Sequence, residues 1–320
     1  MKGFQRQIQK QTDFLKKKII ERDILLVPVS LVFILFSLFV FDLYQKGNFI
    51  VKSVLNPLFS YSPKEFPYLK NNFDPRISAE SSVILDKDTK TVIYNKNGNL
   101  RFSTASTAKI MTALISLEFF NPSDVLVVRQ ATSEGSIIGL KEGDKFTFEN
   151  LLYAMMLPSA NDAAYVIAQN YPGGVDSFVS KMNEKARYFN LLNTHFQDPA
   201  GLLDENDYTT ALELARLASF ALENEYLLKV VNTQSKVIAD ISGFRTYQVF
   251  NRNKLLGIEG IEGIKTGFTE EAGGILVSSK PFDKHSIIFV VMRSEERFED
   301  TLRLVNLVSS GNLTFLSIHP

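Results

Sequence analysis

The stretch FSTASTAKIMTALISL, residues 102–117, decides how the rest of the chain is interpreted. Its second half carries apolar residues at helical spacing, and its first half places Ser106 three residues before Lys109. On a helix, side chains three positions apart share a face. The apolar surroundings predict a buried helix, where an unpaired lysine is costly. Because a serine hydroxyl is a poor nucleophile until a neighbouring base removes its proton, this pair is a candidate for nucleophilic catalysis.

A lysine can act as that base only if its pKa falls, through desolvation or through a second nearby cation. Lys265 is a candidate for the second cation. It is equally a candidate for binding a substrate carboxylate, aided by the Thr266 hydroxyl. A simpler interpretation of the first pair remains open, in which Ser106 is a helix cap and Lys109 a solvated lysine.

Three short motifs follow one another along the chain: Ser106-Thr107-Ala108-Lys109, Ser159-Ala160-Asn161 and Lys265-Thr266-Gly267. Each is common by itself, and the second could be merely a loop with a helix cap. Their order, each in a suitable secondary structure, favours one shared site. There the Ser159 hydroxyl could relay a proton, the Asn161 amide could orient an acyl chain, and Gly267 lets a strand approach the substrate backbone closely.

The pattern around these motifs predicts an α+β fold. Strands are expected near both ends of the globular part and helices between them, which does not fit an alternating parallel fold. We therefore expect an antiparallel β-sheet, flanked by helices, whose terminal strands come together around an inserted, mostly helical subdomain. The catalytic domain is predicted over residues 78–315. Expected strands lie near 83–85, 91–94, 235–240, 246–250, 272–279 and 286–292, and expected helices near 106–119, 148–156, 161–169, 175–189, 210–222 and 296–308.

The amino-terminal region predicts a membrane anchor. Residues 24–41 contain no charge and follow a basic segment, residues 1–23, that should stay cytoplasmic. The prediction is one transmembrane helix in the cell membrane, with the catalytic domain outside. A cleaved secretory signal is the alternative, but Phe39-Val40-Phe41 offers no small-x-small cleavage site. Residues 42–77, rich in X-Pro steps, are predicted to be an extracytoplasmic tether.

Composition excludes several classes of function. Lys+Arg and Asp+Glu both number 35, so there is no basic footprint of a nucleic-acid binder. Cysteine is absent and only three histidines occur, which excludes thiolate chemistry and a zinc site of the H-E-x-x-H type. No metal or cofactor is predicted. A Ser–His–Asp triad through His195 and Asp198 is disfavoured, because no G-x-S-x-G elbow is present.

Longer segments around the motifs resemble the low-molecular-mass penicillin-binding proteins, the serine D-Ala-D-Ala carboxypeptidase family. The similarity covers roughly residues 80–310. It is carried by residues 102–113 and 157–164, by 193–202, which is similar to a Thr-x-Phe-x-Asn-Pro-x-Gly-Leu stretch, and by 263–269. The resemblance implies the fold shared by penicillin-binding proteins and β-lactamases, with the amino-terminal span in place of a carboxy-terminal anchor.

The resemblance also implies a role for each motif residue. Ser106 would be the acylated nucleophile, Lys109 its general base and Ser159 a proton relay to the leaving amine. Asn161 would hold the acyl-side amide, and Lys265 and Thr266 would bind the terminal carboxylate. Gly267 follows them on the same strand, and Arg297 matches a carboxylate-binding arginine near the start of the last helix. Backbone N–H groups of Ser106 and Phe268 would form the oxyanion hole. Phe268 departs from the family, where histidine is common, which puts substrate preference in doubt.

The implied reaction removes the terminal D-Ala from peptidoglycan stem peptides, and the same site would bind β-lactams such as penicillin. Two alternatives are weighed. A class A-like β-lactamase shares all three motifs, but the E-x-x-L-N-like segment that carries its deacylating glutamate is not found in residues 191–207. A catalytically silent cell-wall-binding module is disfavoured because every motif residue is intact. The preferred stem peptide, the balance with endopeptidase activity and the oligomeric state stay open.

Overall fold

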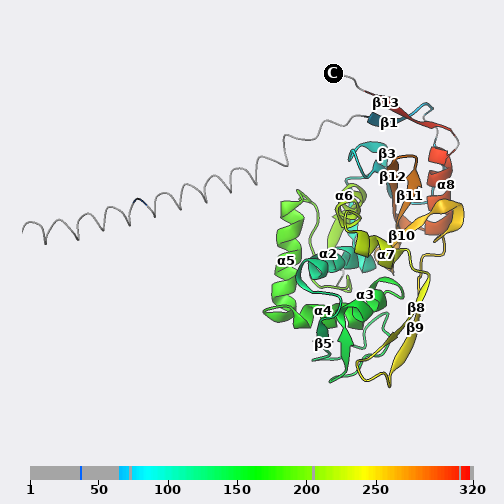
Figure 1. Ribbon diagram of the computed structural model, residues 1–320. Helices are drawn as coiled ribbons and strands as arrows, with labels where there is room; N and C mark the ends of the chain where they lie inside the picture. Colours follow the sequence, from blue (N-terminus) through cyan, green and yellow to red (C-terminus); the bar gives the residue numbers. More distant parts are fainter. Residues whose placement is uncertain (1–36, 38–64, 72–73, 204–205, 310, 318–320) are drawn as a thin grey trace, which may run out of the picture. The chain divides into compact units, whose positions relative to one another are not determined.

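Figure 1 presents the computed structural model of the chain, which describes Ser37 and residues 65–71, 74–203, 206–309 and 311–317. The chain divides into two compact units, residues 1–62 and 63–320. Apart from Ser37, which is helical, the predicted anchor at 24–41 lies outside the described residues. Among the helices that the structure does describe, none has the length and apolar character needed to cross a membrane.

A five-stranded antiparallel sheet forms the centre of the second unit. Its order is β10–β11–β12–β2–β3, so strands from the two ends of the globular part meet where β2 pairs with β12. The prediction of an antiparallel sheet whose terminal strands come together is thus confirmed. The strands are β2 (Ser81–Asp86), β3 (Val92–Lys96), β10 (Glu262–Thr269), β11 (Gly273–Phe282) and β12 (His285–Ser294).

Both faces of the sheet are covered by helices. Along β2, Val83 and Leu85 belong to one hydrophobic cluster and Ile84 to another, because side chains alternate between the faces of a strand. Helix α6 (Ala211–Ala221) packs on one face and α8 (Arg297–Ser309) on the other, as Figure 1 shows. The strand β10 is left at the edge of the sheet, where its backbone is accessible to the site.

The predicted helical subdomain lies between β3 and β10. Thr147 caps α3 by accepting a hydrogen bond from the Asn150 N–H, and Thr210 caps α6 in the same way through Glu213. The predicted helices are confirmed to within a few residues. The elements are η1 (Ala105–Ala108), α2 (Lys109–Phe119), α3 (Phe148–Met156), α4 (Asn161–Asn170), α5 (Gly174–Tyr188), and α7 (Glu225–Val231), which the sequence analysis did not predict.

Four two-stranded ribbons complete the unit. One of them pairs β1 (Glu65–Leu69) with β13 (Leu313–Ser317), so part of the segment predicted as a tether joins the compact unit. Pro67 is compatible with this ribbon because a two-stranded sheet has free edges. The other ribbons are β4 (Arg101–Ser103) with β7 (Tyr208–Thr210), β5 (Val125–Val127) with β6 (Lys145–Thr147), and β8 (Ser235–Ala239) with β9 (Thr246–Phe250).

Candidate active site

Ser106 and Lys109 lie where η1 meets α2. Ser106 is the second residue of η1, and Lys109 begins α2 directly afterwards. The Lys109 Nζ atom lies 3.0 Å from Ser106 Oγ. Ala105, immediately before Ser106, has φ of 43°, a conformation that is uncommon for a residue with a Cβ atom. The structure therefore brings the predicted pair into contact, at a point where the backbone is held in an unfavourable turn.

Lys109 is completely buried, so the alternative of a solvated lysine is wrong. Its Nζ also donates to Asn161 Oδ1 and to the Ala200 carbonyl oxygen, each at 2.7 Å. Burial disfavours the ammonium ion and lowers the pKa of Lys109 to about 7; Asp198 opposes this effect and Arg252 adds to it. Near neutral pH, a large fraction of Lys109 is therefore unprotonated and able to accept the Ser106 proton.

The second motif occupies the turn between α3 and α4. Ser159 is almost fully buried with φ of 67°, and its Oγ atom makes no hydrogen bond with any described residue. A buried, unpaired hydroxyl on a strained backbone is typical of a functional position. Asn161 begins α4, and its Nδ2 donates to the Glu134 carbonyl oxygen at 3.0 Å. Its contact with Lys109 shows that this amide also positions the lysine, which the sequence did not indicate.

The third motif lies on the edge strand β10. Gly267 has no room for a side chain without adjustment, because a Cβ atom would lie 3.2 Å from Ala105 Cβ and 3.3 Å from Ser106 N. The glycine therefore lets the strand lie directly against the Ser106 segment. Thr266 Oγ1 donates to the Ile275 carbonyl oxygen at 3.2 Å and accepts from Arg297 Nε at 2.9 Å.

Lys265 is buried beneath the motif, with its Nζ donating to the Thr266 carbonyl oxygen at 2.9 Å. Burial holds the pKa of Lys265 well below its ordinary value, and the charges of Lys109, Arg252 and Arg297 lower it further. Among the charges that shift the pKa of Lys109, Arg252 lowers it, and the charge of Lys109 in turn lowers the pKa of Lys265.

Arg297 and Phe268 stand at the mouth of the site. Arg297 begins α8, and besides its bond to Thr266 its guanidinium lies 4.9 Å from the Phe298 ring centre and 5.8 Å from that of Phe268. The Phe268 side chain is 62% exposed, so its ring lies at the surface while its backbone borders the site. The predicted arginine therefore reaches the third motif although the two are far apart in sequence.

These residues surround one open cleft of about 540 Å³. Lys109 and Lys265 lie beneath its floor. The predicted residues that line it are Ser106, Ser159, Asn161, Thr266, Gly267, Phe268 and Arg297, and the lining residues that the sequence analysis missed are Gly135, Ser136, Gly201, Leu202, Arg252 and Thr269. Arg252 carried no motif signal, because a single arginine after a strand is usually a surface residue.

A tight loop holds the Ala200 carbonyl against Lys109. The Asp198 carboxylate accepts backbone hydrogen bonds from Ala200 (2.6 Å), Gly201, Leu202 and Leu203 (2.9 Å each). Gly201 has φ of 72°, and a Cβ atom there would lie 1.8 Å from the Ala105 carbonyl oxygen. His195 instead contacts the Asn206 carbonyl oxygen at 2.7 Å through Nδ1, so the structure does not support the triad interpretation.

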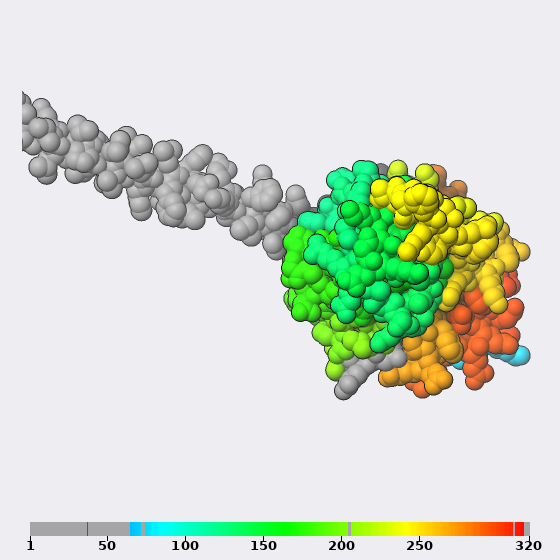
Figure 2. Space-filling model, turned by 90° about the horizontal axis from the view of Figure 1, so that it is seen from below, coloured from blue at the N-terminus to red at the C-terminus, as the bar shows by residue number. Residues whose placement is uncertain are grey.

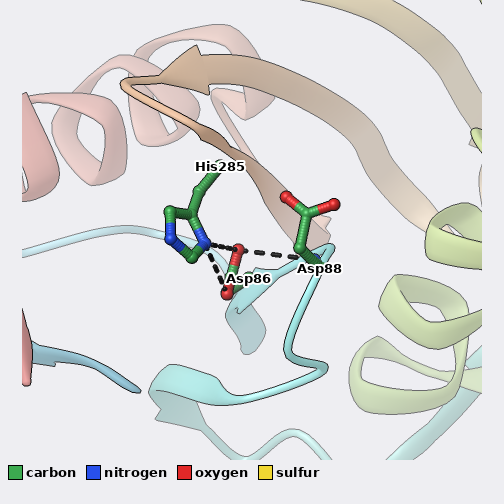
Figure 3. Close-up of side chains that lie close together, drawn as sticks. All are labelled: Asp86, Asp88 and His285. Atoms are coloured by element: carbon green, nitrogen blue, oxygen red, sulfur yellow. Dashed lines mark hydrogen bonds and ion pairs between the residues drawn. The ribbon is translucent and has the colours of Figure 1, made fainter. Parts of the chain in front are cut away.

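One group of possible metal ligands occurs among the described residues, at the turn after β2. Ligand atoms of Asp86, Asp88 and His285 all lie within 4.8 Å of one another (Figure 3). His285 Nδ1 lies 3.1 and 3.3 Å from the two Asp86 oxygens, and Asp88 Oδ2 accepts a hydrogen bond from Ser286 N. Asp86 also accepts bonds from Thr89. These bonds account for the cluster as a link between the turn and β12, and none of the three residues lines the cleft.

The fold and the site together place a serine hydroxyl on an open cleft and in contact with a buried lysine, the arrangement expected of a serine nucleophile beside a base. The model of the peptidase S11 family, described as D-alanyl-D-alanine carboxypeptidase, matches residues 69–296. The chain belongs to this family, which confirms the resemblance and the prediction of a serine-type D-Ala-D-Ala carboxypeptidase that binds penicillin. The family match favours neither the β-lactamase nor the silent binding module.

The chain is similar to proteins that are named as carboxypeptidases, endopeptidases and transpeptidases. It is 34% identical to D-alanyl-D-alanine carboxypeptidase DacF of Bacillus subtilis, over 63% of this chain but only 54% of that protein. It is 31% identical to a D-alanyl-D-alanine endopeptidase of Pseudomonas aeruginosa, over 74% of this chain and 79% of the relative. The crystal structure of the Streptomyces K15 DD-transpeptidase superposes with a TM-score of 0.70 at 33% identity, covering 74% of this chain and 98% of that one.

Proposed function

We propose that the chain removes the terminal D-Ala from peptidoglycan stem peptides through an acyl-enzyme on Ser106. Ser106 Oγ attacks the carbonyl carbon of the penultimate D-Ala while its proton passes to neutral Lys109. The C–N bond breaks, the leaving amine takes up a proton relayed through Ser159, and water then hydrolyses the ester. The single observation that carries the proposal is the buried Lys109, 3.0 Å from Ser106 Oγ, with a pKa of about 7.

Substrate recognition follows from the cations at one end of the cleft. A terminal carboxylate next to Thr266 would lie between Arg297 and the buried Lys265, and its charge would favour the protonated form of Lys265. The Asn161 amide would hold the acyl-side chain. The backbone N–H groups of Ser106 and Phe268 would stabilise the oxyanion, because both residues border the same cleft.

The activity is tested with the full-length chain in detergent. A pentapeptide ending in D-Ala-D-Ala should release D-Ala, and labelled penicillin should acylate the protein slowly and persistently. Ser106→Ala should abolish both. An unlabelled wild-type protein would indicate a silent binding module, and rapid turnover of penicillin a β-lactamase.

The role of Lys265 is tested by amidating the carboxylate of the same pentapeptide. The wild type should lose roughly 2–5 kcal/mol of transition-state binding, the range for truncating one partner of a desolvated charge pair. Lys265→Ala should be nearly indifferent to amidation. Equal sensitivity in both proteins would remove Lys265 from carboxylate recognition.

We also propose that residues 24–41 anchor the chain in the cell membrane as a single pass, with residues 1–23 cytoplasmic, 42–77 as the extracytoplasmic tether and the catalytic domain outside. Support comes from the uncharged stretch after a basic segment, and from a substrate that lies outside the cytoplasm. Protease added to intact spheroplasts should digest the catalytic region. Full protection of that region would contradict the outward orientation.

A further inference from the structure

The unfavourable backbone turn at Ala105 is held by the groups around it. Ala105 has φ of 43°, a conformation that persists only where neighbouring groups fix it. A Cβ atom at Gly201 would meet the Ala105 carbonyl group, and one at Gly267 would lie 3.2 Å from Ala105 Cβ, so both glycines lie against the turn. Both contacts are made by Ala105 itself. They leave open how the chain is held on the entry side of the turn, at Thr104.

The Thr104 hydroxyl is bonded to a carboxylate that is distant in sequence. Thr104 Oγ1 donates a hydrogen bond to Asp207 Oδ1 at 2.7 Å. Both residues are only 1% exposed, so water does not compete for this bond. The hydroxyl takes no part in capping η1, although Thr104 occupies the N-terminal cap position of that helix. Hydrogen bonds to a carboxylate are among the stronger ones in proteins, so this bond is able to fix the position of Thr104.

The ribbon of β4 and β7 explains why these two residues meet. Its two strands are antiparallel, and Ser103 at the end of β4 pairs with Tyr208 at the start of β7. The next residue after β4 is Thr104, and the residue before β7 is Asp207, so the two lie opposite each other. The side-chain bond therefore continues the ribbon by one pair, at the point where the chain passes into the turn and on to Ser106.

His195, which takes no part in a triad, holds the segment that carries Asp207. Its Nδ1 atom donates to the Asn206 carbonyl oxygen at 2.7 Å. Its backbone exchanges two hydrogen bonds with that of Tyr208, at 2.8 and 3.0 Å. Asn206 and Tyr208 flank Asp207 directly, so the backbone is held on both sides of the carboxylate. Asp207 is therefore a fixed point to which Thr104 is attached.

We propose that Asp207 is a positioning residue for the nucleophile. Its bond to Thr104 holds the entry side of the turn at Ala105, and the turn keeps Ser106 Oγ at 3.0 Å from Lys109 Nζ. Neither Thr104 nor Asp207 is among the residues that line the cleft, so the pair acts on Ser106 through the backbone. The inference rests on the acyl-enzyme route described under Proposed function. A displacement of about 1 Å at a reacting atom can lower a rate by about a hundredfold.

The test changes Thr104 and leaves Asp207 in place, because the Asp207 charge also raises the pKa of Lys109. Thr104→Val keeps the shape of the side chain and removes the hydrogen-bond donor, whereas Thr104→Ser keeps the donor. Two constants are measured on the full-length chain in detergent, with fluorescent penicillin at one pH. The first is the acylation rate constant at saturation, and the second is the dissociation constant of the reversible complex. The free energy of unfolding in urea shows whether each variant is folded.

Two controls carry the same substitution elsewhere. Thr209 is buried on β7, and its hydroxyl shares a hydrogen bond with that of Thr194. Thr209→Val therefore removes a buried hydroxyl from the same ribbon without touching Thr104, and it should lower stability alone. Thr246→Val changes an exposed residue of the β8–β9 hairpin, which forms part of the outer surface in Figure 2 (yellow), and it should change neither the rate nor the stability.

Thr104→Val should lower the acylation rate constant about tenfold to a hundredfold. The dissociation constant should stay within about twofold, because no residue that lines the cleft is changed. Thr104→Ser should restore the rate to within about threefold of the wild type. With the pentapeptide, Thr104→Val should likewise lower kcat and leave KM unchanged.

A folded Thr104→Val protein that acylates at the wild-type rate overturns the inference. An equal loss of rate in Thr209→Val or in Thr104→Ser also overturns it. If Thr104→Val does not fold, Thr104→Ala, which lacks the same donor, takes its place under the same criteria. In each of these cases an active wild type leaves the proposed function intact, whereas a wild type that neither labels with penicillin nor releases D-Ala overturns the proposed function and the inference with it.

Discussion

The Asp198 carboxylate offers a sharp test of how the pKa of Lys109 is set. Asp198 is the main influence that opposes the effect of burial on Lys109. Replacing it by asparagine keeps the size of the side chain and removes the charge. The pKa of Lys109 should therefore fall below about 7, which shifts the half-maximal pH of acylation in the acid direction.

The size of the expected pKa shift follows from the effect of a nearby opposite charge, which typically changes a pKa by about one to three units. If the pKa falls by about one unit, the neutral fraction of Lys109 at pH 6 rises from roughly a tenth to roughly a half. At pH 6 the Asp198→Asn variant should therefore reach about a fivefold larger fraction of its own plateau rate. The plateau itself should be lower, because a weaker base removes the Ser106 proton less effectively.

The same substitution should destabilise the loop. The carboxylate accepts four N–H bonds, two on each oxygen, whereas an amide would direct its NH₂ group against two of these donors. Two unsatisfied donors should lower the free energy of unfolding by about 2–4 kcal/mol. Asp300→Asn is the matched control, because Asp300 also accepts backbone bonds, from Ser78 and Ala79, whereas the carboxylates that act on the pKa of Lys109 are Asp198, Asp162 and Asp207.

Two quantities are measured for each protein. The first is the rate of acylation by fluorescent penicillin from pH 5 to 9, and the second is the free energy of unfolding in urea. Asp198→Asn should change both the pH midpoint and the stability, and Asp300→Asn the stability alone. An unchanged midpoint in Asp198→Asn, with the loss of stability present, would refute the view that this charge sets the pKa of Lys109.

Three further results are expected. Lys109→Arg should acylate with penicillin at least about a hundredfold more slowly, because guanidinium cannot deprotonate in a protein; near wild-type labelling would mean that the base lies elsewhere. Gly201→Ala should lower the free energy of unfolding by more than about 2 kcal/mol, because its Cβ atom would lie 1.8 Å from the Ala105 carbonyl oxygen. The control is Gly139→Ala, where φ is 86° but the space is open, and it should lower the free energy of unfolding by only about 1 kcal/mol. Both values are measured by urea titration. The pKa of Lys109 is about 7 in the folded chain and 10.5 ordinarily, so the unfolded chain binds more protons in that range and stability should rise with pH from 7 to 10.5. Lys265, whose pKa is also lowered, contributes to the rise in the same direction. Lys109→Met should therefore make the rise smaller, and an identical pH dependence in both proteins would contradict the assigned pKa.

Much of the site could be predicted because its parts are local. The helical spacing of Ser106 and Lys109 brings their side chains to one face, and local strand patterns near both ends of the globular part predict an antiparallel sheet whose terminal strands come together. The order of the motifs, read with the resemblance they carry, then indicated the chemistry. These inferences depend only on residues that are close in sequence, and the fold and family are confirmed at that level.

The tertiary structure decided what depends on distant segments. Asn161 and Ala200 both contact Lys109, and Asp198 and Arg252 shift its pKa, although all four lie far from it along the chain. Asn161 belongs to a motif, and Asp198 and Ala200 lie in the 193–202 stretch, but no local pattern shows that these residues act on Lys109, because charge and burial act through space. The pairing of β1 with β13 was hidden for the same reason, since Pro67 disfavours a strand until a partner supplies the hydrogen bonds. The sequence by itself determined which groups are available for the reaction, and only the folded structure determined the protonation state in which Lys109 meets Ser106.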